Sequence, residues 1–328
     1  MRALVTGISG FVGGHLTEYL AAEGDLVVGL SASGKWPTDL AHLDRLAGIE
    51  QRDLAAIDES DLADLIVRKQ PEAIYHLAAQ SNPQASMADP RGTWALNLGG
   101  TLNLLEAIRR AGAKLEKKPR VILVGSGVSY GNPAPEHMPV SENCPLRPNN
   151  SYSSSKAAAD LLGVQHFLSY GTDVVMVRPF NHAGPRQSPQ YVLPGLALQV
   201  AQVEAGLKPC VEVGNLDIVR DFTDVRDVVR GYRLLVDRGR AGEIYNLGSG
   251  RGTKLADALA HLVSLANKPV EVKVDPTRFR PVDQTFLVAD PSKLRAETGW
   301  EAAIPIEQTL ADMLEGSRRA LSGSLRTG

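Results

Sequence analysis

The sequence predicts an α/β protein with a Rossmann-type, doubly wound parallel sheet and a smaller, interleaved α/β substrate domain. Two observations predict this class. Short apolar runs alternate with helical patterns over residues 1–179, as in sheets whose strands are covered by helices on both faces. After Pro179 the amino-acid composition changes. The stretch FNHAGPRQSPQYVLPG is rich in Gly, Pro and polar residues, which is typical of a site-forming loop.

The strands expected in the large sheet share an apolar character on both faces. They are RALVTG at 2–7, DLVVGL at 25–30, AIYHLAA at 73–79, VILVGS at 121–126 and DVVMVRP at 173–179. FVGGHLTEYLAAEG at 11–24 has helical spacing and follows the first of them. EIYNLGSG at 243–250 is a further buried run, which we expect to rejoin the first sheet.

The second half of the chain carries helical patterns that flank one short strand pattern. The helices are expected at 196–206, 227–239, 254–266 and 306–321, and the strand at 211–215. The domains should therefore be interleaved. We expect a cofactor-binding domain of residues 1–179, joined by about 221–249, and a substrate-binding domain of about 180–220 and 250–328.

Composition excludes several classes of partner. The chain has 37 acidic and 35 basic residues, a near-balance that favours neither nucleic acid nor an anionic membrane. The two cysteines, Cys144 and Cys210, lie far apart, so neither a disulfide framework nor a metal site is expected. The N-terminus lacks a signal-peptide pattern, and no apolar run is long enough to span a bilayer. We expect a cytoplasmic protein.

A glycine loop follows the first strand and opens the first helix. In TGISGFVGGHL the glycines Gly7, Gly10 and Gly13 are spaced G-x-x-G-x-x-G, with Phe11 and Val12 between them. Glycine allows backbone amides to approach a pyrophosphate at a helix N-terminus. The usual fingerprint has a shorter first gap, and a plain strand–helix turn is the alternative. Its place in the first βα unit favours dinucleotide binding.

The end of the second strand selects between the two nicotinamide cofactors. An acidic residue there would bind the ribose 2′-hydroxyl of NAD, but VVGLSASGK has none. Ser31, Ser33 and Lys35 can instead accommodate a 2′-phosphate, unless they are solvated loop residues. NADP(H) is therefore favoured, and NAD(H) is the alternative. Asp53 and the adjacent Leu54 are candidates for the adenine side, although Asp53 can equally cap the following loop.

Five motifs occur in an order that resembles the extended short-chain dehydrogenase/reductase family, which acts mainly on nucleotide sugars. They are TGISGFVGGHL, YHLAA, NLGGT, YSSSK and RPFN. The resemblance covers nearly the whole chain, and the order of the motifs makes it specific. It implies a catalytic group of Ser126, Tyr152 and Lys156.

The chemistry of this group also follows from the residues themselves. Tyr152 and Lys156 are four apart, so a helix places them on one face. A free tyrosine has a pKa of about 10, and we expect the ammonium of Lys156 to lower the pKa of Tyr152. Tyr152 then exchanges a proton with a carbonyl or alcohol oxygen that Ser126 holds by a hydrogen bond. The alternative is a tyrosine and a lysine on the surface of an amphipathic helix.

The resemblance also implies roles for residues outside the catalytic group. Residues of HLAA, namely Leu77, Ala78 and Ala79, would line the cofactor, whereas His76 is equally well a satisfied core histidine. Asn97 would brace the helix that carries Lys156, unless it is a surface amide.

Further candidates lie in the second half of the chain. Pro179 and Asn181 would lie near the nicotinamide and the substrate. Arg220 and Arg280 are expected near a nucleotide diphosphate, because guanidinium pairs with phosphate in a bidentate manner. A surface ion pair is the alternative for either arginine.

The positions after Ser126 bear on the reaction type. Sugar 4,6-dehydratases of this family carry acidic residues there, but this chain has Gly127 and Val128, which disfavours dehydration. The strings FNHAGPRQSPQYV and VGNLDIVRDFTDVRDVV resemble GDP-4-dehydro-6-deoxy-D-mannose reductases. The resemblance implies NADPH-dependent reduction of the C4 ketone of a nucleotide-linked 4-keto-6-deoxyhexose, with GDP-D-rhamnose as the product.

Other functions remain open at this point. A nucleotide-sugar 4-epimerase with tightly bound NAD can use the same three catalytic residues. A GDP-mannose 4,6-dehydratase and a non-catalytic NADP-sensing protein are further alternatives. The resemblance also implies a homodimer through the helices near 94–112 and 152–170, whose apolar faces can equally belong to the core.

Overall fold

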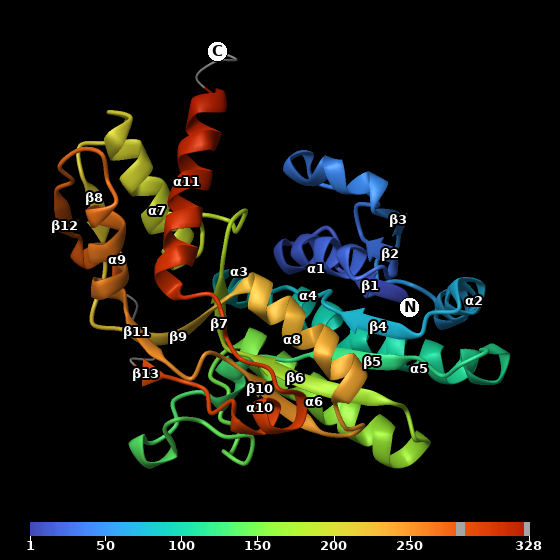
Figure 1. The fold of residues 1–328 in the computed structure, drawn as a ribbon. Coiled ribbons are helices and arrows are strands. Elements are labelled where there is room, and N and C mark those ends of the chain that lie inside the picture. Colours follow the sequence, from blue (N-terminus) through green and yellow to red (C-terminus); the bar gives the residue numbers. More distant parts are fainter. Residues whose placement is uncertain (280–285, 325–328) are drawn as a thin grey trace.

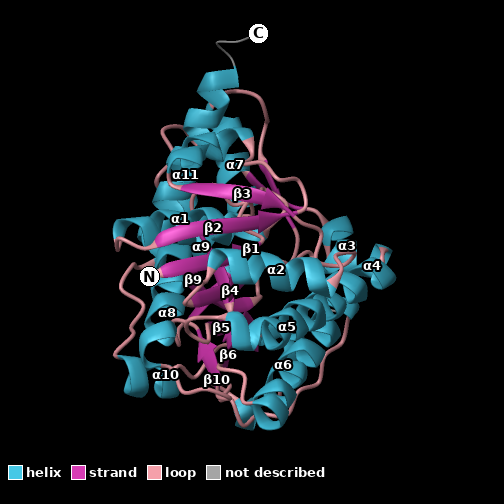
Figure 2. Ribbon diagram, turned by 90° about the vertical axis from the view of Figure 1, so that its right-hand side faces the viewer, coloured by secondary structure: helices cyan, strands magenta, loops and turns pink. Residues whose placement is uncertain are grey.

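A parallel sheet of seven strands organises the molecule, in a computed structural model that describes residues 1–279 and 286–324. Its order is β10-β6-β5-β4-β1-β2-β3, and every neighbouring pair is parallel. Figure 2 shows β3 at one edge and β10 at the other. The strands are β1 (Arg2–Thr6), β2 (Leu26–Ser31), β3 (Ala47–Gln51), β4 (Ala73–His76), β5 (Arg120–Val124), β6 (Val174–Pro179) and β10 (Ile244–Leu247). The predicted fold class is confirmed, including the return of β10 to this sheet.

Helices cover both faces of the large sheet and create two cores. On one face lie α1 (Phe11–Ala22), α8 (Val225–Arg238) and α10 (Ser292–Thr298). On the other lie α2 (Glu59–Lys69), α5 (Gly100–Ala111) and α6 (Ser151–Tyr170). Because both faces are covered, the strands other than the edge strand β3 are mainly apolar rather than alternating.

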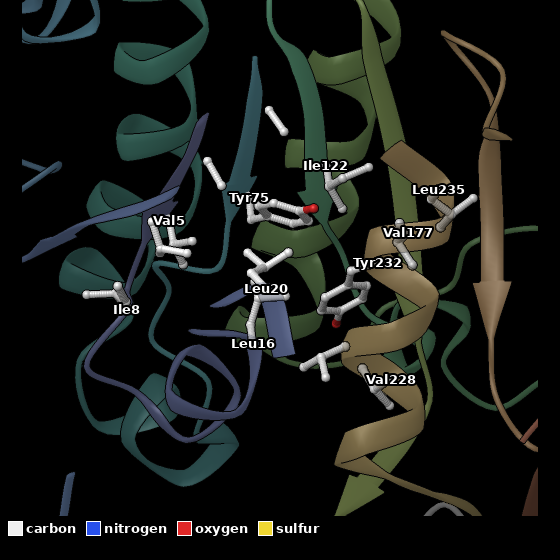
Figure 3. Packing of buried hydrophobic residues seen from close by; sticks show 14 of the residues in the cluster. Val5, Ile8, Leu16, Leu20, Tyr75, Ile122, Val177, Val228, Tyr232 and Leu235 are labelled. Atoms are coloured by element: carbon white, nitrogen blue, oxygen red, sulfur yellow. The ribbon is translucent and has the colours of Figure 1, made fainter. Parts of the chain in front are cut away.

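The first of these cores lies between α1, α8 and the sheet (Figure 3). Leu16 and Leu20 of α1 and Tyr232 of α8 meet Tyr75 and Val177 on the sheet strands, and all five side chains are fully buried. Burial of this apolar area is the main favourable contribution to the free energy of folding.

A second layer is built from the later part of the chain. A four-stranded sheet contains β7 (Asn181–Ala183), β9 (Val219–Asp224), β11 (Gly252–Lys254) and β13 (Phe286–Leu287), and a two-stranded sheet pairs β8 (Val211–Val213) with β12 (Val272–Val274). Three helices, α7 (Val192–Glu204), α9 (Leu255–Ser264) and α11 (Ile306–Ser324), share a core with these strands, as Figure 1 shows. None of the helices within the described residues is long and apolar enough to cross a membrane.

The connections contain short helical turns. They are η1 (Thr38–Arg45), α3 (Pro83–Ala88), α4 (Pro90–Trp94), η2 (Ala95–Gly99), η3 (Gly112–Lys114), η4 (Gly127–Tyr130), η5 (Pro135–His137) and η6 (Pro276–Arg278). Residues 132–150 follow the irregular path that their proline content predicts, apart from η5 and an isolated bridge from Val140 to Ala289. Strand β3 was not predicted, because AGIEQ is neither continuously apolar nor alternating.

One segment that follows the boundary expected near residue 250 packs against the large sheet. Leu294 of α10 and Trp300 are fully buried in the core of the large sheet, beside α8. The Trp300 indole donates to the backbone oxygen of Asp227 (2.9 Å). The Asp227 carboxylate accepts from the amides of Ala303 and Ile304, both at 2.8 Å. This segment therefore packs with the large sheet, although it follows the second layer in sequence.

The aspartates of the string VRDFTDVRD each fasten a different segment. Asp221 accepts from the amides of Ser249, Gly250 and Ala289. Asp224 caps α8 and accepts from the Thr309 hydroxyl (2.7 Å). Asp221, Asp224 and Asp227 are each three residues apart. Together they tie the loop after β10, helix α11 and the segment after α10 to one short stretch of chain. The aspartates of the string therefore serve assembly, whereas Arg220 and Phe222 within it line the cavity described below.

Asp227 provides a test of this assembly. Replacing it by Ala leaves two part-buried backbone amides without their acceptor, so Asp227→Ala should lower the free energy of unfolding by about 2 kcal/mol. Urea denaturation followed by circular dichroism measures this change. Asp257→Ala, on the exposed face of α9, is the control and should change stability by less than about 0.5 kcal/mol. Equal stability of the two variants would contradict the role of Asp227.

Candidate active site

A cavity of about 1060 Å³ lies at the carboxyl ends of the large sheet, between that sheet and the second layer. Open parallel sheets bind ligands at this edge, where the strand order reverses between β1 and β4. Most residues predicted from sequence line it. They are Gly7, Gly10, Phe11, Val12, Gly13, Leu77, Ala78, Ala79, Ser126, Tyr152, Lys156, Pro179, Asn181 and Arg220.

The glycine loop leaves no room for side chains. Gly7 has φ +70°, and a Cβ there would lie 2.8 Å from the backbone of Ala78. A Cβ on Gly13 would lie 2.3 Å from the Ile8 oxygen. Gly10 caps α1 without any side-chain hydrogen bond, so the first amides of this 12-residue helix face the cavity without a side-chain acceptor. The loop therefore fits an anionic pyrophosphate approaching the start of α1.

The three catalytic candidates converge on the cavity from two elements. Helix α6 begins with a capping box between Asn150 and Ser153, which fixes the first turn and places Tyr152 and Lys156 on one face. Ser126 follows β5 and caps the turn Gly127–Tyr130. The Ser126 hydroxyl hydrogen-bonds the phenol of Tyr152. A substrate oxygen can replace either partner in this contact.

The pKa of Tyr152 is raised, whereas the sequence analysis predicts that Lys156 lowers it. Burial raises the pKa of Tyr152 to about 12, and the hydrogen bond from Ser126 opposes this only in part. The expected lowering by Lys156 is absent, because the Lys156 ammonium donates to the backbone oxygen of Val124 (2.7 Å). Tyr152 is therefore a neutral phenol at physiological pH, which is a proton donor rather than a base.

The pKa of Lys156 shifts in the opposite direction to that of Tyr152. Burial lowers the pKa of Lys156 to about 8, while the charge of Asp160, one turn further along α6, acts to raise it. Asp160 in turn forms a buried ion pair with Arg178 (2.8 Å). Lys156 therefore carries its charge at neutral pH and loses it only a little above neutrality.

His76 is a satisfied core histidine, one of the two readings left open by the sequence. Thr101 donates to the Asn97 backbone oxygen (2.6 Å), so its hydroxyl accepts from His76 Nε2 (2.9 Å). Nδ1 must then accept from Thr6 (2.8 Å), whose oxygen accepts the amide of Ala78 (3.2 Å). Burial, with a smaller effect of Lys156, lowers the pKa of His76 to about 3, so the ring stays neutral. This series of hydrogen bonds links the ends of β1 and β4 below the cavity.

Asn97 lies behind the cavity wall instead of on it. Its amide donates to Ser155 of α6 (2.9 Å) and to the Gln80 oxygen (3.2 Å), and its carbonyl accepts from the Gln80 amide (2.8 Å). This is the bracing of the catalytic helix that the sequence suggested. Asn97 is fully buried, so it is not a surface amide.

Several predicted cofactor residues do not line the cavity. The Ser31 hydroxyl is bonded to that of Ser33 (2.9 Å) in a turn that closes β2. Asp53 caps its own loop by accepting from the Ala55 amide (3.0 Å), and Leu54 is buried in the core under α2 and α5. In this arrangement their polar groups are satisfied locally. Arg280 lies outside the described residues.

Other cavity residues carried no motif in the sequence. Tyr191 lies across the cavity and hydrogen-bonds Ser81 (3.1 Å). Phe180 covers Gly127 so closely that a Cβ on Gly127 would lie 2.7 Å from its ring. Among the described residues that line the cavity, the one carboxylate is Glu212, which pairs with Arg278 (2.7 Å). No group of three metal-ligating side chains occurs within the described ranges.

The comparisons with known proteins agree with this geometry. The family model described as GDP-mannose 4,6 dehydratase matches residues 4–313. The chain belongs to the GDP-mannose 4,6-dehydratase family, within the short-chain dehydrogenase/reductases. This confirms the family resemblance found in the sequence, and the members compared are NAD(P)-dependent enzymes of oxidoreductase type.

Individual relatives span the whole chain. The GDP-6-deoxy-D-mannose reductase of Pseudomonas aeruginosa is 36% identical, covering 95% of this chain and 96% of its own. The solved RMD of Pseudomonas aeruginosa complexed with NADPH has a TM-score of 0.84 at 34% identity, over 97% of this chain and 99% of its own. The UDP-glucose 4-epimerase of Thermus thermophilus, in complex with NAD, has a TM-score of 0.84 at 30% identity, over the same 97% and 99%. Similarity alone therefore does not decide between a reductase and a 4-epimerase.

The shifted pKa of Lys156 can be measured directly. In an exposed lysine the ammonium persists to about pH 10.4, but burial lowers the pKa of Lys156 to about 8, so its charge should be present below pH 8 and lost above it. NMR of isotopically labelled lysine should show one resonance titrating there, absent in Lys156→Met. Because the charge of Asp160 raises the pKa of Lys156, Asp160→Asn should move that titration to lower pH. A titration near about pH 10.4 would contradict the site electrostatics.

Proposed function

We propose that this protein reduces the C4 ketone of a nucleotide-linked 4-keto-6-deoxyhexose with NADPH, converting GDP-4-dehydro-6-deoxy-D-mannose to GDP-D-rhamnose. The observation that carries the proposal is the protonated, buried Tyr152 beside Ser126, in a cavity whose described lining has no carboxylate near them. A neutral phenol suits reduction, which consumes a proton at the carbonyl oxygen. The similarity to the Pseudomonas reductase supports the same reaction.

The residues divide the work of reduction among them. Ser126 donates a hydrogen bond to the C4 carbonyl oxygen and polarises it. When bound, NADPH supplies the hydride that the C4 carbon accepts. Tyr152 donates its proton to the developing alkoxide, which becomes the hydroxyl group of the product. Lys156, whose pKa is about 8, is charged at neutral pH and would orient the ribose of the cofactor from the wall of the same cavity.

Two structural features support NADP(H) over NAD(H) as the cofactor. Strand β2 ends at Ser31, and no acidic residue follows it before Lys35, whose side chain is exposed. The backbone amide of Arg52 donates to the backbone oxygen of Ser31 (2.9 Å), so the basic residue that follows β3 lies beside this turn. The solved Pseudomonas relative is complexed with NADPH, whereas the Thermus epimerase is complexed with NAD.

Dehydration is disfavoured by packing as well as by sequence. Elimination needs an acid beside the reacting sugar carbons. At position 127 any side chain would collide with the Phe180 ring, and Val128 presents only methyl groups to the cavity. The carboxylate of Glu212 is engaged by Arg278 on the second layer. The site is therefore suited to a ketone that has already lost its C6 hydroxyl.

The second layer supplies the cationic groups for a nucleotide diphosphate. Arg220 lines the cavity, together with Arg278. We assign the diphosphate to this side, with guanine as the base on the strength of the relatives. On this reading, residues 1–179 with about 221–249 and the segment after α10 hold the cofactor, and the other later residues hold the substrate.

We further propose a homodimer through helices α5 and α6. Large apolar side chains are exposed along them, which is unusual for a monomeric surface. They are Leu102, Leu161, Leu168 and Tyr170, with Trp94 of α4 nearby. A second copy related by a two-fold axis would cover the same patch on both chains. We expect such a dimer to act in the cytoplasm, on small nucleotide sugars.

A 4-epimerase with tightly bound NAD is the second candidate, because the Thermus relative has that activity. Such an enzyme oxidises and then reduces the sugar, so its tyrosine must also act as a base. The raised pKa of Tyr152 opposes that role. Cofactor released on denaturing the purified protein separates the candidates, because bound NAD favours the epimerase and NADP or an empty site favours the reductase.

Absorbance in the NADPH band is the direct assay, with freshly made GDP-4-dehydro-6-deoxy-D-mannose as the substrate. We expect NADPH oxidation and a GDP-6-deoxyhexose product. Tyr152→Phe should slow turnover by at least about 100-fold while changing NADPH affinity by less than about threefold, since only the proton donor is lost. Absence of oxidation in the wild type, with interconversion of UDP-glucose or GDP-mannose and an epimer, would overturn the proposal. Near-normal turnover in Tyr152→Phe would remove Tyr152 from the mechanism.

A further inference from the structure

We propose that Arg186 is a positioning residue that fixes the cavity loop, residues 184–191, on helix α1 and thereby shapes the substrate side of the cavity. The inference rests on the proposed function for the identity of the sugar, but part of its test does not depend on it. Nothing in the sequence motifs or the catalytic group assigns this arginine a role.

The backbone of Arg186 is strained. Its φ is +71°, in the left-handed region that L-residues other than glycine rarely adopt. Gln70, at the end of α2, is the other non-glycine residue with positive φ within the described residues. A strained conformation persists only where surrounding contacts impose it, and such residues cluster at functional sites.

The contacts that impose it come from α1. The Arg186 guanidinium donates to both carboxylate oxygens of Glu18, at 2.8 and 2.5 Å. Its side chain is only 24% exposed, so the pair is partly shielded from water. Burial acts to raise the pKa of Glu18, but the hydrogen bond and charge of Arg186 outweigh it, and the carboxylate stays ionised. A bidentate geometry of this kind fixes orientation as well as distance.

A buried histidine completes the anchor. His15 Nε2 lies 3.0 Å from the Pro185 oxygen, which can only accept, so Nε2 carries the hydrogen. His15 Nδ1 is then an acceptor and takes a hydrogen bond from Arg186 Nη2 (3.0 Å). The arrangement needs a neutral ring. Burial, followed by the charge of Arg186, lowers the pKa of His15 to about 4 and keeps it neutral. Two successive loop residues are thus held by one turn of α1.

From this anchor the loop crosses the cavity and is held again on the other side. Tyr191 at its far end hydrogen-bonds Ser81 (3.1 Å), and Gln190 accepts from Asn82 (3.3 Å). Gln187, next to Arg186, lines the cavity and donates to the His182 oxygen (3.1 Å). The His182 ring lies parallel to that of Phe11, with 6.3 Å between centroids. The loop is therefore fixed at both ends, and the residues between them line the cavity.

These contacts join the two binding functions of the cavity. The same helix presents its N-terminal amides to the cofactor diphosphate and its Glu18 and His15 to the loop. The loop in turn presents Tyr191 and Gln187 to the substrate. Loss of Arg186 should therefore weaken substrate binding without removing any group that takes part in proton or hydride transfer.

Arg186→Gly tests this role, because glycine relieves the backbone strain and at the same time removes the anchor. The free protein should show faster hydrogen exchange of the amides in 184–191. Its thermal stability should be unchanged or higher, since positive φ suits glycine. In turnover of the GDP sugar, KM should rise about tenfold while kcat changes by less than about threefold, as loss of one coupled contact predicts. Glu18→Gln should show the same pattern more weakly.

Gln70→Gly is the matched control, because it relieves the same type of strain far from the cavity and should leave KM and loop exchange unchanged. Unchanged exchange of 184–191 in Arg186→Gly would overturn the inference, whatever the substrate proves to be. So would an equal rise of KM in the control. If the wild type does not reduce the GDP sugar, the proposed function fails, and the exchange measurement still decides the role of Arg186.

Discussion

The reversal of strand order between β1 and β4 is the constraint on which the rest of the site depends. All seven strands of the large sheet are parallel, so their carboxyl ends open at one edge, and the reversal separates the loops there. The glycine loop after β1, the HLAA segment after β4 and Ser126 after β5 are thereby brought to one cavity, although they are spread over more than a third of the chain.

The electrostatics of the cavity follow from burial. A phenol and an ammonium taken out of water both favour their neutral forms, so the pKa of Tyr152 rises and that of Lys156 falls. At neutral pH the phenol holds its proton, and the ammonium, although destabilised by burial, is still charged. A neutral phenol suits the proposed reduction, which consumes a proton.

Much of the fold and part of the site could be predicted from the sequence. Continuous apolar runs identified the strands of the large sheet other than β3, because covered parallel strands need no alternation. The glycine loop and the Tyr152–Lys156 pair were found because their function requires fixed spacing along one loop and one helix. What spacing cannot show is how groups from distant segments compensate one another.

The failures of sequence analysis have this common origin. The direction of the Tyr152 pKa shift depends on burial and on the Val124 oxygen, which lies 32 residues from the Lys156 ammonium it accepts from. Ser31, Asp53 and Leu54 do not line the described cavity, since local turns or the core hold their side chains, and their contacts with the cofactor remain predictions. The string VRDFTDVRD carries part of the resemblance to the reductases, yet its aspartates hold three remote segments together. The anchoring of Arg186 by Glu18 and His15 spans about half the chain and leaves no local pattern.

Transfer of isotope from the cofactor to the sugar tests the central claim most directly. The protein would be given NADPH carrying deuterium at the transferable position of the nicotinamide, with GDP-4-dehydro-6-deoxy-D-mannose, and the product would be examined by NMR. If Tyr152 protonates the oxygen of a ketone that accepts hydride at C4, the product is a GDP-6-deoxyhexose with deuterium at C4. A product without deuterium at C4, formed while the labelled NADPH remains unconsumed, would contradict the account.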